Sequence, residues 1–220
     1  MEPVRLTTTP QGLQIEGIPD GTHVVSVVGV LARRLADLQL HATDLSFAAA
    51  ALDALGRMEP DDSLVREALW RTAIVHYFKC FGEGARFQLS ERKLHKGLDP
   101  IVHTIFGYFK DLRNKHFVHD ENAYAQATVC AVLNNGSKPY KVEKVVCVAA
   151  LAKTSTADNV GNLGNLVQVA LRWVELQHRE ASRLITEDLE KQSMATLTGA
   201  AVPSLRVPLL NEIGKKRHTQ

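Results

Sequence analysis

Apolar residues recur with helical spacing over most of the chain. Between 27 and 55 they follow a period close to 3.6 residues, and residues 64–81 are apolar around most of a helical circumference. A third apolar stripe covers 101–112, directly after Asp99-Pro100, which is a helix-start signal. Residues 158–191 have the spacing of one long helix with a single buried face. The pattern predicts a mainly α protein in which 64–81 is central to the core.

Two other segments alternate in the manner of strands. Residues 4–18 contain a Pro-Gln-Gly turn between short alternating runs, which predicts a small β-hairpin. Residues 125–133 and the valine-rich 140–151 flank the turn signal Asn134-Asn135-Gly136, which predicts a second hairpin. The two hairpins can pair into one small sheet beside the helices. A helical structure for 121–134 stays open as the alternative.

Length and composition agree with a folded globular protein. The 220 residues include 45% hydrophobic and 23% charged positions, values that are ordinary for a chain that folds in water. We expect one domain over 1–198, with the hairpin at about 4–18, a helical core at about 27–190 and a flexible tail over 199–220.

The cysteines and the N-terminus narrow the expected location. The 3 cysteines include no CxxC pair, which argues against a disulfide framework or a zinc knuckle and favours a reducing compartment. Residues 1–10 lack the basic and apolar regions of a signal peptide, and no apolar run is long enough for a membrane span. We therefore expect a cytoplasmic protein without membrane contact. No HExxH sequence accompanies the histidines, so no metal or other cofactor is expected.

Positive charge is concentrated in one part of the sequence. The whole chain has a net charge of +2, but residues 66–115 hold ten Lys or Arg and five Asp or Glu, which is a local net charge of +5. Such a segment can bind a polyanion, and it is equally typical of a solvated loop.

The most chemically specific stretch lies at the end of this basic region. Residues 113–120 read Arg-Asn-Lys-His-Phe-Val-His-Asp. Arginine presents a planar fork of donors that fits a phosphate, and histidine exchanges protons near neutral pH. Together they suffice for metal-independent RNA cleavage, in which histidine takes the proton of a ribose 2′-hydroxyl and arginine neutralises the phosphate. The alternative is structural, because cations at a helix C-terminus are stabilised by roughly 0.3–1 kcal/mol each.

Helical geometry limits which of these side chains can meet. On a continuous α-helix with about 100° per residue, His116 lies about 60° from Arg113 and Asp120 about 20° from it. His119 lies about 120° away. Asp120 would then be placed to polarise a histidine. For His119 to approach Arg113, the helix must end or bend near Phe117-Val118.

The segment Leu112–His119 resembles the Arg-x(4–6)-His motif of the HEPN superfamily, the higher eukaryotes and prokaryotes nucleotide-binding proteins. Asn114 matches the usual asparagine after the arginine, and five residues separate Arg113 from His119. The upstream segment Val75–Gly82 is also similar to the end of the second long helix of that superfamily. The likeness extends over roughly residues 30–190.

The resemblance implies a helical bundle with endoribonuclease activity, found in toxin–antitoxin, abortive-infection and CRISPR systems. It implies that Arg113 binds phosphate, that His119 is the acid or base, that Asn114 assists and that His116 is an optional second imidazole. It further implies a two-fold homodimer that brings two motifs to one cleft, with RNA and an antitoxin as partners. The cations that we expect to contact RNA are Lys115, Lys110, Arg86 and Lys96. The alternative is a non-catalytic HEPN-like module that binds a nucleotide, RNA or a protein.

Overall fold

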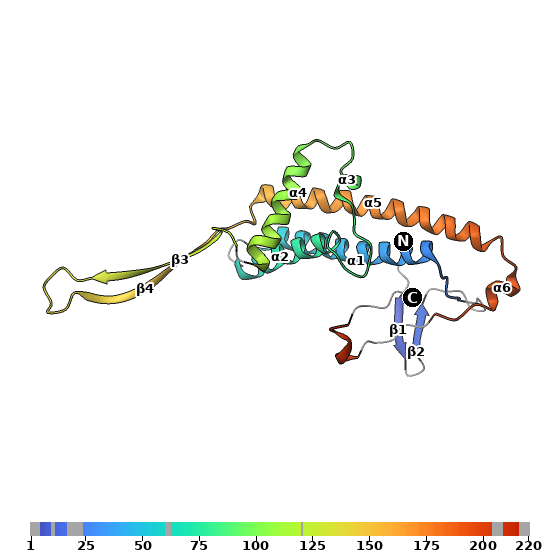
Figure 1. The fold of residues 1–220 in the computed structure, drawn as a ribbon, viewed down its shortest axis with the longest axis horizontal. Coiled ribbons are helices and arrows are strands. Elements are labelled where there is room, and N and C mark those ends of the chain that lie inside the picture. Colours follow the sequence, from blue (N-terminus) through green and yellow to red (C-terminus); the bar gives the residue numbers. More distant parts are fainter. Residues whose placement is uncertain are drawn as a thin grey trace. The chain divides into compact units, whose positions relative to one another are not determined.

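The chain is mainly helical and carries two small β-hairpins, as the hydrophobic pattern predicts (Figure 1). The computed structural model describes residues 5–9, 12–16, 24–59, 63–119, 121–203 and 209–215. The α-helices are α1 (Val30–Arg57), α2 (Ser63–Lys79), α3 (Glu91–Leu94), α4 (Ile101–Asp111), α5 (Ala157–Leu189) and α6 (Met194–Thr198). A π-helix, η1, covers Leu112–Val118, and a 3-10 helix, η2, covers Leu210–Glu212. The strands are β1 (Arg5–Thr9), β2 (Gly12–Glu16), β3 (Ala125–Leu133) and β4 (Val142–Leu151).

Internal contacts divide the chain into two compact units. Unit 1 comprises Met1–Gln39, Glu83–Phe87 and Glu175–Gln220, and unit 2 comprises Leu40–Gly82 and Gln88–Val174. Helices α1 and α5 each contribute to both units. The single domain over 1–198 and the flexible tail after it stay predictions.

Helix α2 is central to the core of unit 2, which confirms the role predicted for 64–81. Trp70 is fully buried and its ring lies edge-on against Phe109 of α4, with centroids 5.8 Å apart. Its indole nitrogen donates a hydrogen bond of 2.9 Å to the hydroxyl of Thr154, which is also buried. Tyr77 and Phe78 pack against Phe106 of α4. Each fully buried aromatic or aliphatic side chain stabilises the fold by about 1.5–3 kcal/mol.

The start of α4 follows from the local sequence. The carboxylate of Asp99 accepts a 2.9 Å hydrogen bond from the backbone nitrogen of Ile101. Pro100 has a φ of −52°, which is already helical, and it brings no backbone N–H that would need a partner at this position. These two residues fix where the helix that leads into the basic motif begins.

Both predicted hairpins form, but the expectation that they pair with each other is wrong. Strands β1 and β2 make one two-stranded sheet, and β3 and β4 make another. In β3–β4, Gly136 takes a φ of 87° at the turn. Nearly every residue of both strands is exposed, and the hairpin extends away from the helices of its own unit in Figure 1. The helical alternative for 121–134 is also wrong, because most of that segment is strand β3.

Unit 1 joins the first turns of α1 to the second half of α5. Arg34 donates to the side-chain oxygen of Gln177 at 3.4 Å, and its guanidinium lies 4.8 Å from the ring centre of Phe87. The backbone nitrogen of Phe87 donates to Asp37 at 3.1 Å.

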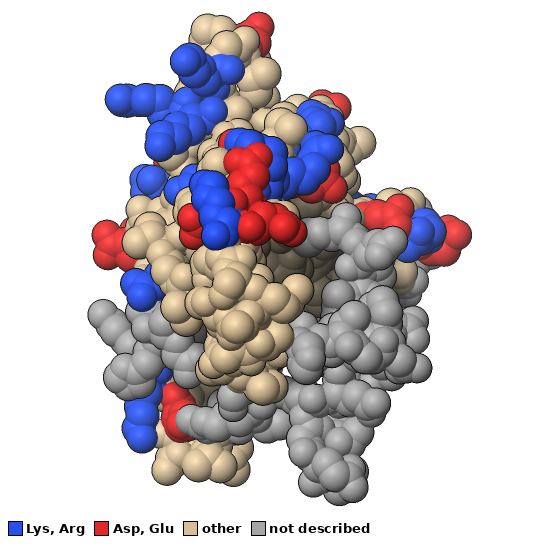
Figure 2. Space-filling model, turned by 90° about the vertical axis from the view of Figure 1, so that its right-hand side faces the viewer, with Lys and Arg blue, Asp and Glu red and all other residues tan. Residues whose placement is uncertain are grey.

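The surface charge is mixed on the face that Figure 2 shows. Basic side chains (blue) lie beside acidic ones (red) there. That face is therefore not a continuous basic surface.

Within the described ranges, no helix combines the length and the apolar character that crossing a membrane requires.

Candidate functional site

The candidate motif lies on a π-helix that continues α4. Residues Leu112–Val118 have the wider π-helical turn, and helical structure ends at Val118. His119 follows with φ −117° and ψ −9°. The end of the helix at Val118 confirms the break that the motif required. Short π-helical turns inside or at the end of α-helices occur frequently at functional sites.

Arg113 is half-buried and held by its neighbour. Its Nη1 donates a 2.7 Å hydrogen bond to Oδ1 of Asn114, which is also half-buried. Its Nε is buried and has no hydrogen-bond partner among the described residues. An unsatisfied buried donor costs about 1–3 kcal/mol. The guanidinium is therefore fixed at Nη1, and its Nε is shielded from solvent.

His119 and Arg113 share no hydrogen bond or ion pair in the described residues. His119 is exposed, whereas Arg113 is half-buried. Asp120, which the geometry of a continuous helix would bring beside Arg113, lies outside the described residues. The two principal motif side chains thus sit in different environments of the same protomer.

His116 is buried, at 9% exposure, on the inner side of η1. Its ring lies 5.2 Å from that of Phe117 and 5.5 Å from that of Tyr124, measured between centroids. Its Nδ1 has no hydrogen-bond partner among the described residues. An imidazole with a free ring nitrogen beside a cavity can bind a ligand oxygen or exchange a proton with it.

A pocket of about 270 Å³ opens at His116. Its lining combines α2, η1 and the segment that follows β4: Ser63, Arg66, Glu67, Arg71, His116, Leu151, Ala152, Lys153 and Ser155. Three of these side chains are cations and one is an acid, so the pocket has a positive lining. It is therefore suited to an anionic ligand.

The cations of the pocket differ in how firmly they are held. Nη1 of Arg66 donates to the carbonyl oxygens of Leu55 and Met58 at the end of α1. This part of the guanidinium is therefore already occupied. Arg71 pairs with Glu67 at 2.7 Å, and its guanidinium stacks 4.7 Å from the ring centre of Phe117 in η1. In this orientation the guanidinium of Arg71 still has N–H groups that can donate to a phosphate.

Most of the cations chosen from the sequence lie outside this pocket. Lys115 is exposed and pairs with Asp111 at 3.4 Å, and Lys110 and Lys96 are exposed as well. Arg86 belongs to unit 1 and is half-buried. Sequence reasoning missed Arg71 and Lys153 as site residues, because their approach to His116 depends on how α2 and the end of β4 pack. Arg71 had one usable signal, its place within the basic segment 66–115.

Comparison with protein-family models, with curated proteins and with solved structures finds no match to this chain.

Proposed function

We propose that this chain is a metal-independent endoribonuclease of HEPN type, acting in a toxin–antitoxin or anti-phage defence setting. The observation that carries the proposal is the positive pocket at His116 beside the π-helical Arg113–His119 segment. The partly exposed guanidinium of Arg113 supports phosphate binding, and the exposure of His119 supports contact with a substrate.

In the proposed reaction, the imidazole of His119 takes the proton of a ribose 2′-hydroxyl. The 2′-oxygen attacks the adjacent phosphorus, the bond from phosphorus to the 5′-oxygen breaks, and that oxygen leaves with a proton. His116 is the proposed source of this proton. Arg113 and Arg71 neutralise the charge on the non-bridging oxygens. The products carry a 2′,3′-cyclic phosphate and a 5′-hydroxyl, so no water or metal enters the step.

The separation of Arg113 from His119 within one protomer requires a second copy of the chain. In the two-fold dimer that the resemblance implies, His119 of one protomer approaches Arg113 of its partner. The end of the helix at Val118 supports this arrangement, because it leaves His119 outside the helical hydrogen-bond network and exposed. Catalysis then depends on dimer formation, and a monomer binds RNA without cleaving it.

A second candidate is a non-catalytic module that binds RNA or a nucleotide. The specific observation in its favour is that the pocket contains His116, whereas neither Arg113 nor His119 lines it. A pocket with one imidazole and three cations suffices to hold a phosphate without reacting with it.

Cleavage of total RNA in EDTA by the purified chain tests the proposal. The wild type is expected to degrade RNA, while Arg113→Ala and His119→Ala lose about 100-fold or more in rate. His178→Ala, which removes a half-buried histidine of α5 outside the site, is the matched control and should keep wild-type activity. Equal activity of the wild type and both motif variants would contradict the catalytic assignment. Binding without cleavage by the wild type would favour the non-catalytic module.

A further inference from the structure

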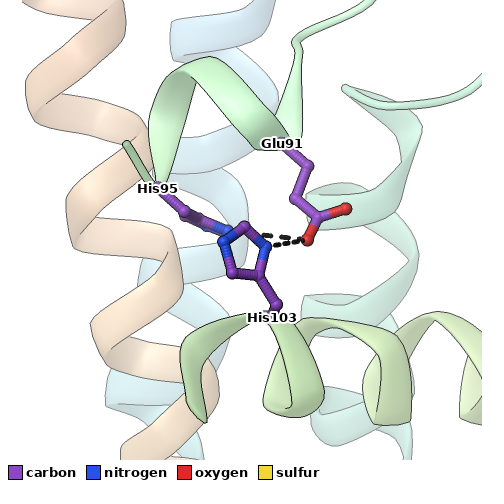
Figure 3. Close-up of side chains that lie close together, drawn as sticks. All are labelled: Glu91, His95 and His103. Atoms are coloured by element: carbon purple, nitrogen blue, oxygen red, sulfur yellow. Dashed lines mark hydrogen bonds and ion pairs between the residues drawn. The ribbon is translucent and has the colours of Figure 1, made fainter. Parts of the chain in front are cut away.

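Three side chains that the sequence analysis left out of any site converge in unit 2. Glu91 opens the short helix α3, His95 follows that helix, and His103 lies in the first turn of α4 (Figure 3). One ring nitrogen of each histidine and one carboxylate oxygen of Glu91 lie within 4.8 Å of one another. Figure 3 shows the three side chains pointing toward one another from α3, the residue after it and α4.

We propose that Glu91, His95 and His103 form a binding site for a divalent transition-metal ion, with Zn²⁺ as the favoured occupant. Two imidazoles and one carboxylate are a common protein ligand set for zinc, which leaves a fourth position for water. This site is independent of the proposed ribonuclease chemistry, in which no metal takes part.

The distances between the ligand atoms are close to those that zinc requires. Nδ1 of His103 lies 2.7 Å from Oε1 of Glu91, and Nδ1 of His95 lies 3.9 Å from the same oxygen. Bonds of about 2.0–2.1 Å in a tetrahedral arrangement put ligand atoms about 3.3 Å apart. These two distances lie on either side of that value, and all three ligand atoms lie within 4.8 Å of one another, so shifts of about 1.5 Å or less bring the set together.

The burial of His95 supports the assignment. His95 is 1% exposed, and both of its ring nitrogens are buried without a hydrogen-bond partner among the described residues. Buried polar atoms in native proteins are nearly always paired, so an imidazole with two unsatisfied nitrogens calls for a ligand. Its ring lies 5.5 Å from that of Phe106 and 5.6 Å from that of His103, in edge-on arrangements. Figure 3 shows the His95 side chain directed toward Glu91 and His103, where a shared ion would bind.

The exposure of His103 also suits a metal ligand. His103 is half-exposed, which gives an ion a route from solvent. Metal binding at Nδ1 of His103 displaces the hydrogen bond between that nitrogen and Glu91, and the neutral imidazole then carries its one proton on Nε2.

The proposed metal ion would link α3 and the residue that follows it to the start of α4. Leu89 and Leu94 are buried on either side of Glu91, so this segment is partly anchored without a metal. Metal coordination would add a cross-link between α3 and the helix that leads into η1. The expected consequence is a higher thermal unfolding midpoint in the presence of Zn²⁺.

Titration with ZnCl₂ and CoCl₂ of the EDTA-treated, tag-free chain tests the site. The protein carries Cys130→Ala and Cys147→Ala, because exposed thiols are themselves zinc ligands and would obscure the titration. One equivalent of Zn²⁺ is expected at micromolar concentration or below, together with Co²⁺ absorption bands typical of low coordination number. His103→Ala and Glu91→Gln should each weaken binding by tenfold or more, while the control His178→Ala keeps the parent affinity.

Two results would overturn the proposal. One is a parent protein that binds less than one equivalent of Zn²⁺ at 100 micromolar free metal, a concentration about a hundred times above the micromolar affinity that the proposal predicts. The other is His103→Ala binding as tightly as the parent. His103 is 49% exposed on its side chain, so its removal leaves the core intact, and circular dichroism of each variant verifies the fold.

Discussion

Arg113 donates a 2.7 Å hydrogen bond to the side chain of the residue that follows it, Asn114. This bond fixes one arm of the guanidinium, and the buried Nε has no partner among the described residues. Asn114 therefore orients the side chain of Arg113.

The first prediction concerns this orienting bond. Asn114→Ala should weaken binding of a 2′-O-methyl RNA by about 2- to 10-fold, since one net hydrogen bond contributes about 0.5–1.5 kcal/mol. Fluorescence anisotropy measures the affinity. Asn165→Ala, an exposed asparagine on α5, should have no effect. Equal RNA affinity of Asn114→Ala and the wild type would show that the bond to Asn114 does not orient Arg113 for RNA binding.

The second prediction concerns Arg71, which stacks on Phe117 and lines the pocket at His116. Arg71→Gln should weaken RNA binding and reduce the slope of log K against log salt by about 0.7, the value for one phosphate contact on a single strand. Arg57→Gln is matched, because Arg57 also pairs with an acid four residues earlier, at 2.6 Å, but lies outside the pocket. Equal salt slopes for Arg71→Gln and Arg57→Gln would mean that the RNA does not contact Arg71.

The third prediction concerns the buried bond between Trp70 and Thr154. Thr154→Val should lower the free energy of unfolding by about 1–3 kcal/mol, because the indole N–H stays buried without an acceptor. Urea denaturation measures the change, and the exposed Thr128→Val should alter stability by less than about 0.5 kcal/mol. Combined with Trp70→Phe, the loss should be smaller than the sum of the single losses. Additive losses would mean that the bond contributes nothing.

The fourth prediction concerns the alkaline stability of the core. Burial raises the pKa of Tyr77 above its ordinary value of 10.0, Cys80 and Glu91 add to the effect, and the hydroxyl has no partner. The folded state keeps the proton while the unfolded state releases it, so this stability is complete below pH 10 and is lost as pH rises.

Tyr77→Phe should therefore be at least as stable as the wild type at pH 7, because no hydrogen bond is lost. Above about pH 10 the stability of the wild type should fall more steeply, by up to about 1.4 kcal/mol per pH unit. Urea denaturation between pH 7 and 11 checks this, with the exposed Tyr140→Phe as control. Parallel curves for the wild type and Tyr77→Phe would contradict it.

Local signals were sufficient for most of the helices and for both hairpins. Asp99 and Pro100 marked the start of α4, and Asn134-Asn135-Gly136 marked the turn between β3 and β4. The relation between the hairpins was not predictable, because strand pairing across the chain depends on packing that no short pattern encodes. The π-helix was not predicted, because the four-residue spacing of the buried Leu112 and His116 suits an α-helix equally well.

Of the residues predicted for the site, His116 lines the pocket, and the roles of the others stay predictions. The helix end at Val118 followed from the motif, whereas the meeting of Arg71 with Phe117 depends on how α2 packs against η1. The proposed metal site had one sequence signal, the four-residue spacing of Glu91 and His95, within the basic region 66–115. His103 joins them only through the turn between α3 and α4.

The most direct measurement is the cleavage of a defined RNA in EDTA by folded wild-type protein, with mass analysis of the product ends. The account predicts a 2′,3′-cyclic phosphate and a 5′-hydroxyl, no cleavage of the 2′-O-methyl RNA, and rates about 100-fold lower for His119→Ala. Intact RNA after incubation with the folded wild-type protein, or equal cleavage of both RNAs, would contradict it.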